Sequence, residues 1–255
     1  MTNDNDKQHG PKVRGHSVSK YRRARRDRLT KSLNLLRERV SLLEMELNDY
    51  TSEHFRVCIF GSARIKEDDE IYKITEHLAY LLGEQGVDLL TGGGHGLMGA
   101  ANKGVVAGRE AFGTKSWSYG ISVDLNKFES LNEHLDIKHH HKKFSSRLDD
   151  FMRLSNCVVA TPGGIGTLLE IYYTWQLLQL GIMSERPLIL LKKSFWQGII
   201  DWMRAQQLGN GLVWESDFRF VHIVDTPEEA MVLIKEAFQS FKEKRHKSLE
   251  NQTEK

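Results

Sequence analysis

The sequence contains little cysteine or proline and no long hydrophobic run. Its 255 residues include two cysteines and four prolines. Cys58 and Cys157 each lie in an apolar run typical of a strand, so we expect buried, reduced thiols and neither a disulfide nor a metal site. No apolar stretch is long enough to cross a membrane, and the polar N-terminus has no segment of the secretory type. These absences predict a cytoplasmic protein without a membrane partner, although an arginine-rich organelle leader stays open.

A strong excess of charge of one sign is missing as well. The formal net charge is only +2, which argues against a polyanion-binding surface over the whole molecule. Hydrophobic residues make up 40% of the chain, enough for one substantial domain and an appendage. Function must therefore be sought in local motifs.

Both ends of the chain differ in composition from its middle. Residues 1–26 are polar and basic and predict a disordered tail; we favour a solubilising role over binding to nucleic acid or an anionic surface. Residues 27–50 predict an amphipathic helix, because apolar residues alternate at spacings of four and three. This helix either docks on the main domain or joins a dimer interface. Residues 243–255 form a charged C-terminal tail. The apolar stripe comprises Leu29, Leu33, Leu36, Val40, Leu43 and Leu47.

Residues 51–242 alternate between short apolar runs and amphipathic segments. Near-continuous apolar runs are typical of parallel strands covered on both faces. Repeated strand–helix units predict an α/β fold, a Rossmann-like doubly wound parallel sheet with the added N-terminal helix. The predicted strands are 56–60, 87–91, 116–123, 157–161, 187–191 and 220–224, and the predicted helices lie near 68–83, 96–108, 144–155, 167–180, 194–207 and 227–241.

A glycine turn follows the strand predicted at 157–161. Gly163, Gly164 and Gly166 let the backbone approach an anion closely, and the amide groups at a helix start point toward it. Thr167 adds a hydroxyl donor. Glu170 lies three residues further along the predicted helix, on the same side. This order predicts a phosphate cradle with a carboxylate near the sugar of a bound nucleotide.

The nine residues from Pro162 to Glu170 fit the pattern PGGxGTxxE. In this pattern, and over roughly residues 56–240, the chain resembles the LOG family of cytokinin-activating phosphoribohydrolases and their bacterial relatives, which are often labelled lysine decarboxylases. The resemblance implies hydrolysis without a cofactor or metal, and a homodimer whose subunits meet near the helix after Glu170. The segment 120–132 lacks the proline of plant-type members, which favours a bacterial-type member.

Two further glycine-containing turns follow the first and second predicted strands. Gly61 and Ser62 end the first, where Ser62 either contacts a nucleotide or caps the turn. Gly92, Gly93 and Gly94 end the second, in a run similar to the TGGGxGxM segment that lines the nucleotide cleft in the LOG family. Gly94, Gly96 and Gly99 also fit the dinucleotide fingerprint GxGxxG, so a dinucleotide-binding protein stays open as a minor alternative.

Arg147 lies where the family has its catalytic arginine, counted back from Pro162. The family has lysine next, where this chain has Leu148, which leaves any second basic contact in doubt. A surface ion pair between Arg147 and Asp150 is the alternative. The three histidines at 139–141 are expected in a solvated loop, because three neighbours cannot all reach one metal.

These motifs predict a nucleoside 5′-monophosphate as substrate. Glu170, with Arg147, would support cleavage of the N-glycosidic bond to free base and ribose 5-phosphate. A non-catalytic carrier of a nucleotide or a molybdenum cofactor is the alternative, since the same glycines would serve it. No motif fixes the base preference.

Overall fold

The computed structural model describes residues 22–23, 25–36, 39–40, 43, 54–123 and 130–253, with side chains up to residue 247. The chain divides into two compact units, Met1–Thr51 and Ser52–Lys255. The described residues of the first unit are helical. The helix therefore begins before residue 27, and its first arginines, Arg22 and Arg23, do not belong to a disordered tail. Arginine is a good helix former, which explains the earlier start.

The apolar stripe of this helix faces solvent. Leu29, Leu36 and Leu43 are 61%, 63% and 48% exposed, and Leu33 and Val40 are similar. Leu47 and the rest of the predicted segments 1–26 and 27–50 lie outside the described residues. The choice between docking and dimerisation for this helix therefore stays a prediction.

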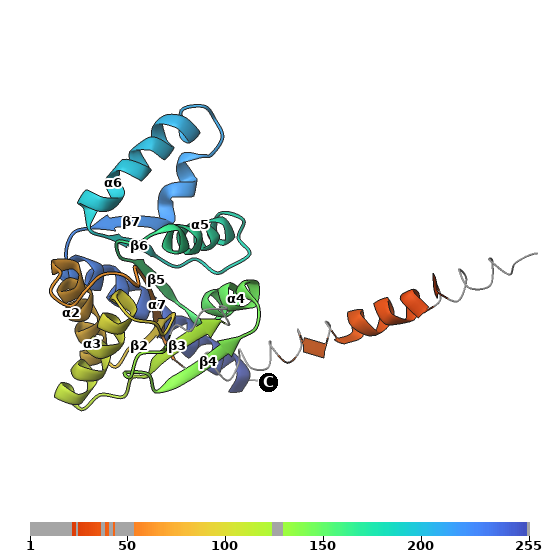
Figure 1. The fold of residues 1–255 in the computed structure, drawn as a ribbon, viewed down its shortest axis with the longest axis horizontal. Coiled ribbons are helices and arrows are strands. Elements are labelled where there is room, and N and C mark those ends of the chain that lie inside the picture. Colours follow the sequence, from red (N-terminus) through yellow and green to blue (C-terminus); the bar gives the residue numbers. More distant parts are fainter. Residues whose placement is uncertain are drawn as a thin grey trace, which may run out of the picture. The chain divides into compact units, whose positions relative to one another are not determined.

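The second unit contains one seven-stranded sheet in which all pairs are parallel (Figure 1). Its spatial order is β4-β3-β2-β1-β5-β6-β7. The chain winds outward from β1 to β4, then returns to the other side of β1 and continues to β7. This reversal confirms the predicted doubly wound α/β fold and puts the topological switch point between β1 and β5. The strands are β1 (Arg56–Phe60), β2 (Asp88–Thr91), β3 (Ser118–Val123), β4 (Ile137–His141), β5 (Cys157–Ala160), β6 (Leu188–Leu191) and β7 (Val221–Val224).

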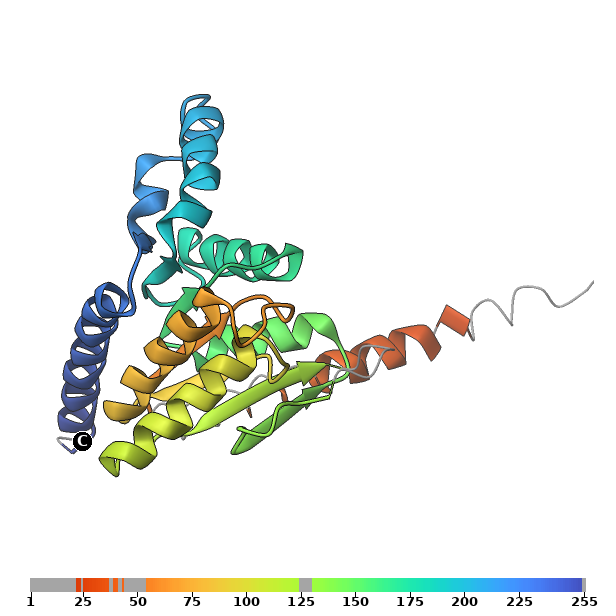
Figure 2. The same cartoon turned by 60° about the vertical axis from the view of Figure 1, so that its left-hand side comes forward.

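Helices cover both faces of the sheet (Figures 1 and 2). The helices of one face are α2 (Glu70–Glu84), α3 (Leu97–Phe112) and α7 (Pro227–Thr253); those of the other are α4 (Phe144–Leu154), α5 (Ile165–Gln179) and α6 (Lys193–Trp202). A π-helix (Met203–Leu208) and a 3-10 helix (Glu215–Phe220) follow α6.

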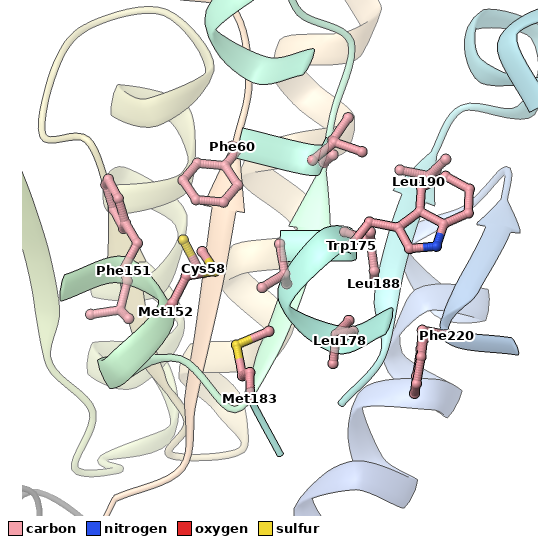
Figure 3. Packing of buried hydrophobic residues seen from close by; sticks show 14 of the residues in the cluster. Cys58, Phe60, Phe151, Met152, Trp175, Leu178, Met183, Leu188, Leu190 and Phe220 are labelled. Atoms are coloured by element: carbon pink, nitrogen blue, oxygen red, sulfur yellow. The ribbon is translucent and has the colours of Figure 1, made fainter. Parts of the chain in front are cut away.

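Strand β1 shows why a continuous apolar run is needed. Cys58 and Phe60 pack into the cluster beneath α4 and α5, whereas Val57 and Ile59 pack into the cluster beneath α2, α3 and α7. Alternate side chains of a strand point to opposite faces, so both sets must be apolar. Figure 3 shows the first cluster, in which the rings of Phe60 and Phe151 meet edge to face at 5.0 Å.

The structure corrects three boundaries of the prediction. The histidines at 139–141 belong to the edge strand β4, not to a loop, because their run alternates between half-buried and exposed side chains. Helix α5 begins at Ile165, two residues before the predicted start. Helix α7 continues to Thr253, so residues 243–253 of the predicted tail belong to this helix. Among the residues that the structure describes, no helix is both long and apolar enough to cross a membrane.

Candidate active site

The three glycine-containing turns meet at the carboxyl end of the sheet, beside the switch point. The backbone N–H of Ser62 donates to the carbonyl of Pro162 (3.2 Å), and the N–H of Leu97 donates to the carbonyl of Ser62 (3.0 Å). The backbone of Ser62, just after β1, is thus hydrogen-bonded both to the turn before α5 and to the start of α3. The predicted site segments, far apart in sequence, are brought together here.

Ser62 takes a local role with its side chain. Its hydroxyl oxygen accepts a hydrogen bond from the backbone N–H of Arg64 (3.1 Å), which is the capping alternative. The neighbouring Gly61 has no room for a side chain, because a Cβ atom there would lie 2.1 Å from Oγ1 of Thr161. Both residues therefore hold the turn in shape.

The start of α5 has the features of an anion cradle. Gly164 is the N-cap residue, and no side chain caps the helix. A Cβ atom on Gly163 would lie 2.1 Å from Oγ1 of Thr167, so this glycine is required by packing. A Cβ atom on Gly164 or Gly166 would meet nothing within 4 Å, which leaves open space beside the first helical amides. Such amides, with the helix dipole, favour a bound phosphate.

Glu170 is buried one turn into α5, and its side chain is only 10% exposed. Burial disfavours the charged form and raises the pKa of this carboxyl to about 7, although the charge of Arg147 acts in the opposite direction. A pKa near neutrality allows Glu170 to exist in both protonation states under physiological conditions. Such a value is typical of a functional carboxyl group.

Arg147 comes from α4 and reaches the same point. Its Nη1 lies 3.6 Å from Oε1 of Glu170, and its Nε donates to the carbonyl of Ile121 on β3 (2.8 Å). The guanidinium carbon lies 5.0 Å from the ring centre of Phe151. The structure thus brings the predicted pair Arg147 and Glu170 together. Asp150, the partner in the alternative prediction, forms its ion pairs with Arg153 and two histidines of β4.

The second glycine run lies directly against Arg147. A Cβ atom on Gly92 would be 2.5 Å from Nη2 of Arg147, so only glycine leaves room for the guanidinium. Gly93 has a φ of 75°, a conformation that favours glycine. A Cβ atom on Gly94 would lie 2.8 Å from Cε of Met98. At Gly92 and Gly94 the absence of a side chain thus lets the backbone pack closely against Arg147 and Met98.

Two asparagines that the sequence analysis missed hold this run in place. The side-chain amide of Asn132 donates to the carbonyls of Gly93 (3.1 Å) and Gly94 (2.9 Å). It also donates to Oδ1 of Asn102, which in turn accepts a hydrogen bond from Thr91. Both asparagines are buried. Single asparagines outside a motif carry no sequence signal, so only the structure identifies them.

The remaining predicted features have no demonstrated chemistry. Nε2 of His95 lies 2.8 Å from Oγ of Ser130, at an exposed position. Over the described ranges, no group of three or more histidine, cysteine, aspartate or glutamate side chains is arranged to hold a metal ion.

The chain is similar in sequence to known proteins. Residues 98–234 match the family model described as "possible lysine decarboxylase". A probable cytokinin riboside 5′-monophosphate phosphoribohydrolase of Oryza sativa subsp. japonica is 26% identical over 183 residues, 71% of this chain and 83% of that protein. A cytokinin riboside 5′-monophosphate phosphoribohydrolase of Arabidopsis thaliana is 26% identical over 195 residues, 74% and 87% of the two proteins.

Solved structures share the fold. A molybdenum cofactor binding protein from the phototrophic bacterium Rippkaea orientalis superposes with a TM-score of 0.52 at 23% identity, covering 73% of this chain and 98% of that one. This likeness concerns the fold alone. The family model spans more than half of the chain and ends well beyond the PGGxGTxxE motif, and on this ground the protein belongs to the LOG family.

Proposed function

We propose that this protein hydrolyses the N-glycosidic bond of a nucleoside 5′-monophosphate, releasing free base and ribose 5-phosphate. The observation that carries the proposal is the buried carboxyl group of Glu170, 3.6 Å from the guanidinium of Arg147 and one turn after the glycine cradle. The two plant relatives are phosphoribohydrolases of cytokinin nucleotides. We propose that this chain cleaves the same type of bond as these relatives, and we do not assign their base preference to it.

Glu170 would act on the charge that develops at the sugar. With the phosphate at Gly163–Thr167 and the base toward Gly92–Gly94, the anomeric carbon comes near this carboxyl group. As the carbon–nitrogen bond breaks, its electron pair leaves with the base and the ribose becomes oxocarbenium-like. The ionised carboxylate stabilises this positive charge and orients the attacking water. The oxygen of water then forms the new bond to the anomeric carbon, and its proton is lost as the base takes one up.

Arg147 would serve as a fixed positive charge. A guanidinium does not lose its proton at neutral pH, so Arg147 is unsuited to act as a general acid. Its place between Gly92 and Glu170 suits it to hold the phosphate or to stabilise negative charge on the departing base. It also keeps Glu170 more acidic than burial alone would allow.

A carrier function explains the pair less well. The likeness to the molybdenum cofactor binding protein supports only a common fold. A carrier needs the glycine cradle, but it has no need of a carboxyl group whose pKa is raised toward 7 beside an arginine. The hydrolase is therefore the function we favour.

The direct test is a panel of AMP, GMP, CMP and cytokinin riboside monophosphates with detection of released base. We expect at least one substrate, and a loss of about 10²–10³-fold in kcat for Glu170→Gln, because one electrostatic contact to the transition state disappears. Glu110→Gln, an exposed position on α3, is the matched control and should keep wild-type activity. Absence of base release from every nucleotide, with wild type and Glu170→Gln alike, ends the hydrolase proposal.

The rate should depend on the ionisation of Glu170. Since the pKa of this carboxyl is about 7, we expect kcat/KM to rise with pH through 7 and to level off above it. The second pKa of the substrate phosphate, about 6, adds a further rise in kcat/KM near pH 6. The pH profile of Glu170→Gln should keep only this rise near pH 6. If the variant still shows the rise near pH 7, that rise belongs to a group other than Glu170.

The open space at Gly166 gives a test of phosphate docking. Gly166→Ala meets no neighbouring atom and should leave stability unchanged or raise it by about 0.5 kcal/mol, because alanine restricts the unfolded chain. Its methyl group would still enter the cradle, so we expect KM to rise about tenfold, a loss of about 1.4 kcal/mol. Gly198→Ala on α6 has equally free space and is the matched control for stability. If Gly166→Ala keeps the wild-type KM, the substrate phosphate does not bind at the start of α5.

The burial of Glu170 also predicts how stability varies with pH. Between pH 4.5 and about 7 the folded protein keeps a proton that the unfolded chain has already released. The free energy of unfolding should therefore fall as the pH rises through this range, by up to about 3 kcal/mol. Glu170→Gln should lack this decrease. Chemical denaturation at pH 5 and pH 8 measures the change in the free energy of unfolding. An equal change in wild type and in Glu170→Gln would place Glu170 in a more solvated environment.

A further inference from the structure

We propose that Asp150, together with His139 and His141, forms a latch that positions Arg147 for the reaction. This inference rests on the proposed function, because it assigns a role around the same arginine. The latch joins α4, which carries Arg147, to the edge strand β4. The hydrogen bonds described for these three residues do not include Glu170, so we assign them a role through Arg147, as positioning residues.

The latch is a pair of imidazoles on one carboxylate oxygen. Nδ1 of His139 lies 3.1 Å and Nε2 of His141 lies 3.2 Å from Oδ2 of Asp150. The two histidines are two residues apart on a strand, so their side chains leave the same face. The other carboxylate oxygen, Oδ1, accepts hydrogen bonds from Arg153. The side chain of Asp150 is only 10% exposed.

Hydrogen bonding fixes Asp150 as an anion. Burial opposes its ionisation, but hydrogen bonds from His139, Arg153 and His141 outweigh burial and lower the pKa of this carboxyl to about 2. Asp150 is therefore charged at neutral pH. A buried carboxylate that loses a partner leaves an unsatisfied charge, so the latch favours one closed arrangement.

The surroundings of His141 strengthen this arrangement. Oγ of Ser146 donates to the carbonyl of Lys143 (3.0 Å) and lies 3.1 Å from Nδ1 of His141. Nε2 of the same ring lies 3.2 Å from Oδ2 of Asp150, so both ring nitrogens of His141 have a partner on α4. The first turn of α4 has no side-chain cap and is held by these contacts.

Arg147 is tied to the same structural unit. It lies three residues before Asp150 on α4, and its Nε donates to the carbonyl of Ile121. Ile121 is paired with His139 across β3 and β4. The arginine thus spans from α4 to β3, and the latch joins the same helix to β4, the strand paired with β3. Displacing a group by about 1 Å in an active site can cost about 10²-fold in rate.

A double-mutant cycle tests the coupling. We expect Asp150→Asn to lower kcat at least tenfold while KM changes less, because the guanidinium is displaced from the reacting atoms. In an Arg147→Lys background the same change should have a much smaller effect, since residues that act through one another are not additive. Asp149→Asn is the matched control, because Asp149 is the neighbouring carboxylate and bonds Tyr173 instead. Equal fold-changes of Asp150→Asn in both backgrounds would overturn the latch.

Histidine variants keep the proposal testable if Asp150→Asn does not fold. In His139→Asn the amide nitrogen lies near the position of Nδ1 and can donate to Asp150, whereas leucine cannot. His139→Asn should therefore retain most of the activity that His139→Leu loses. Equal activity of these two variants would contradict the latch, as would wild-type activity in both.

A readout without substrate separates this inference from the proposed function. The hydrogen bond to Ile121 should protect the Nε–H of Arg147 from exchange with solvent in ¹⁵N-labelled protein, with the signal assigned by its loss in Arg147→Lys. His139→Leu should speed this exchange at least tenfold, and Asp149→Asn should not. If no nucleotide is hydrolysed but exchange responds in this way, the hydrolase fails and the positioning of Arg147 stands. Unchanged exchange in His139→Leu would overturn the latch whatever the activity.

Discussion

The buried approach of the Arg147 guanidinium to the Glu170 carboxyl group is the interaction on which the site depends. The two groups lie 3.6 Å apart and both side chains are largely removed from water. At the carboxyl group the effect of desolvation exceeds the effect of the nearby arginine charge. Its pKa is therefore raised to about 7, and the arginine limits this rise. The site thus combines a permanent cation with a carboxyl group that can ionise near neutral pH, and the fold must hold both in place.

The fold holds Arg147 and Glu170 in place through close packing of the glycine backbone against neighbouring side chains. Gly92 leaves room for the guanidinium, and Gly163 leaves room for Thr167 at the start of α5. A doubly wound sheet opens its carboxyl end at the switch point between β1 and β5, where these turns converge. Phe151, a buried residue of one apolar layer, lies under the guanidinium of Arg147, whose central carbon is 5.0 Å from the ring centre.

Arg147 also connects this site to the edge of the sheet. It contacts Ile121 of β3, while Asp150 on the same helix binds the histidines of β4. An edge strand has a neighbouring strand on one side only. The contacts between Asp150 and the two histidines attach this edge strand to the helix that carries the arginine.

The alternating order of strands and helices and the positions of the glycine turns can be predicted from the amino-acid sequence, because apolar periodicity and turn residues are local properties. The prediction that Arg147 and Glu170 share one site came from the resemblance to the LOG family, in which an arginine precedes the PGGxGTxxE motif at this spacing. Only the tertiary structure decided the pKa of Glu170, the support of Gly93 by Asn132, and β4 with its histidine latch. These features depend on burial and on contacts between residues far apart in the chain, and neither quantity is written in the local pattern.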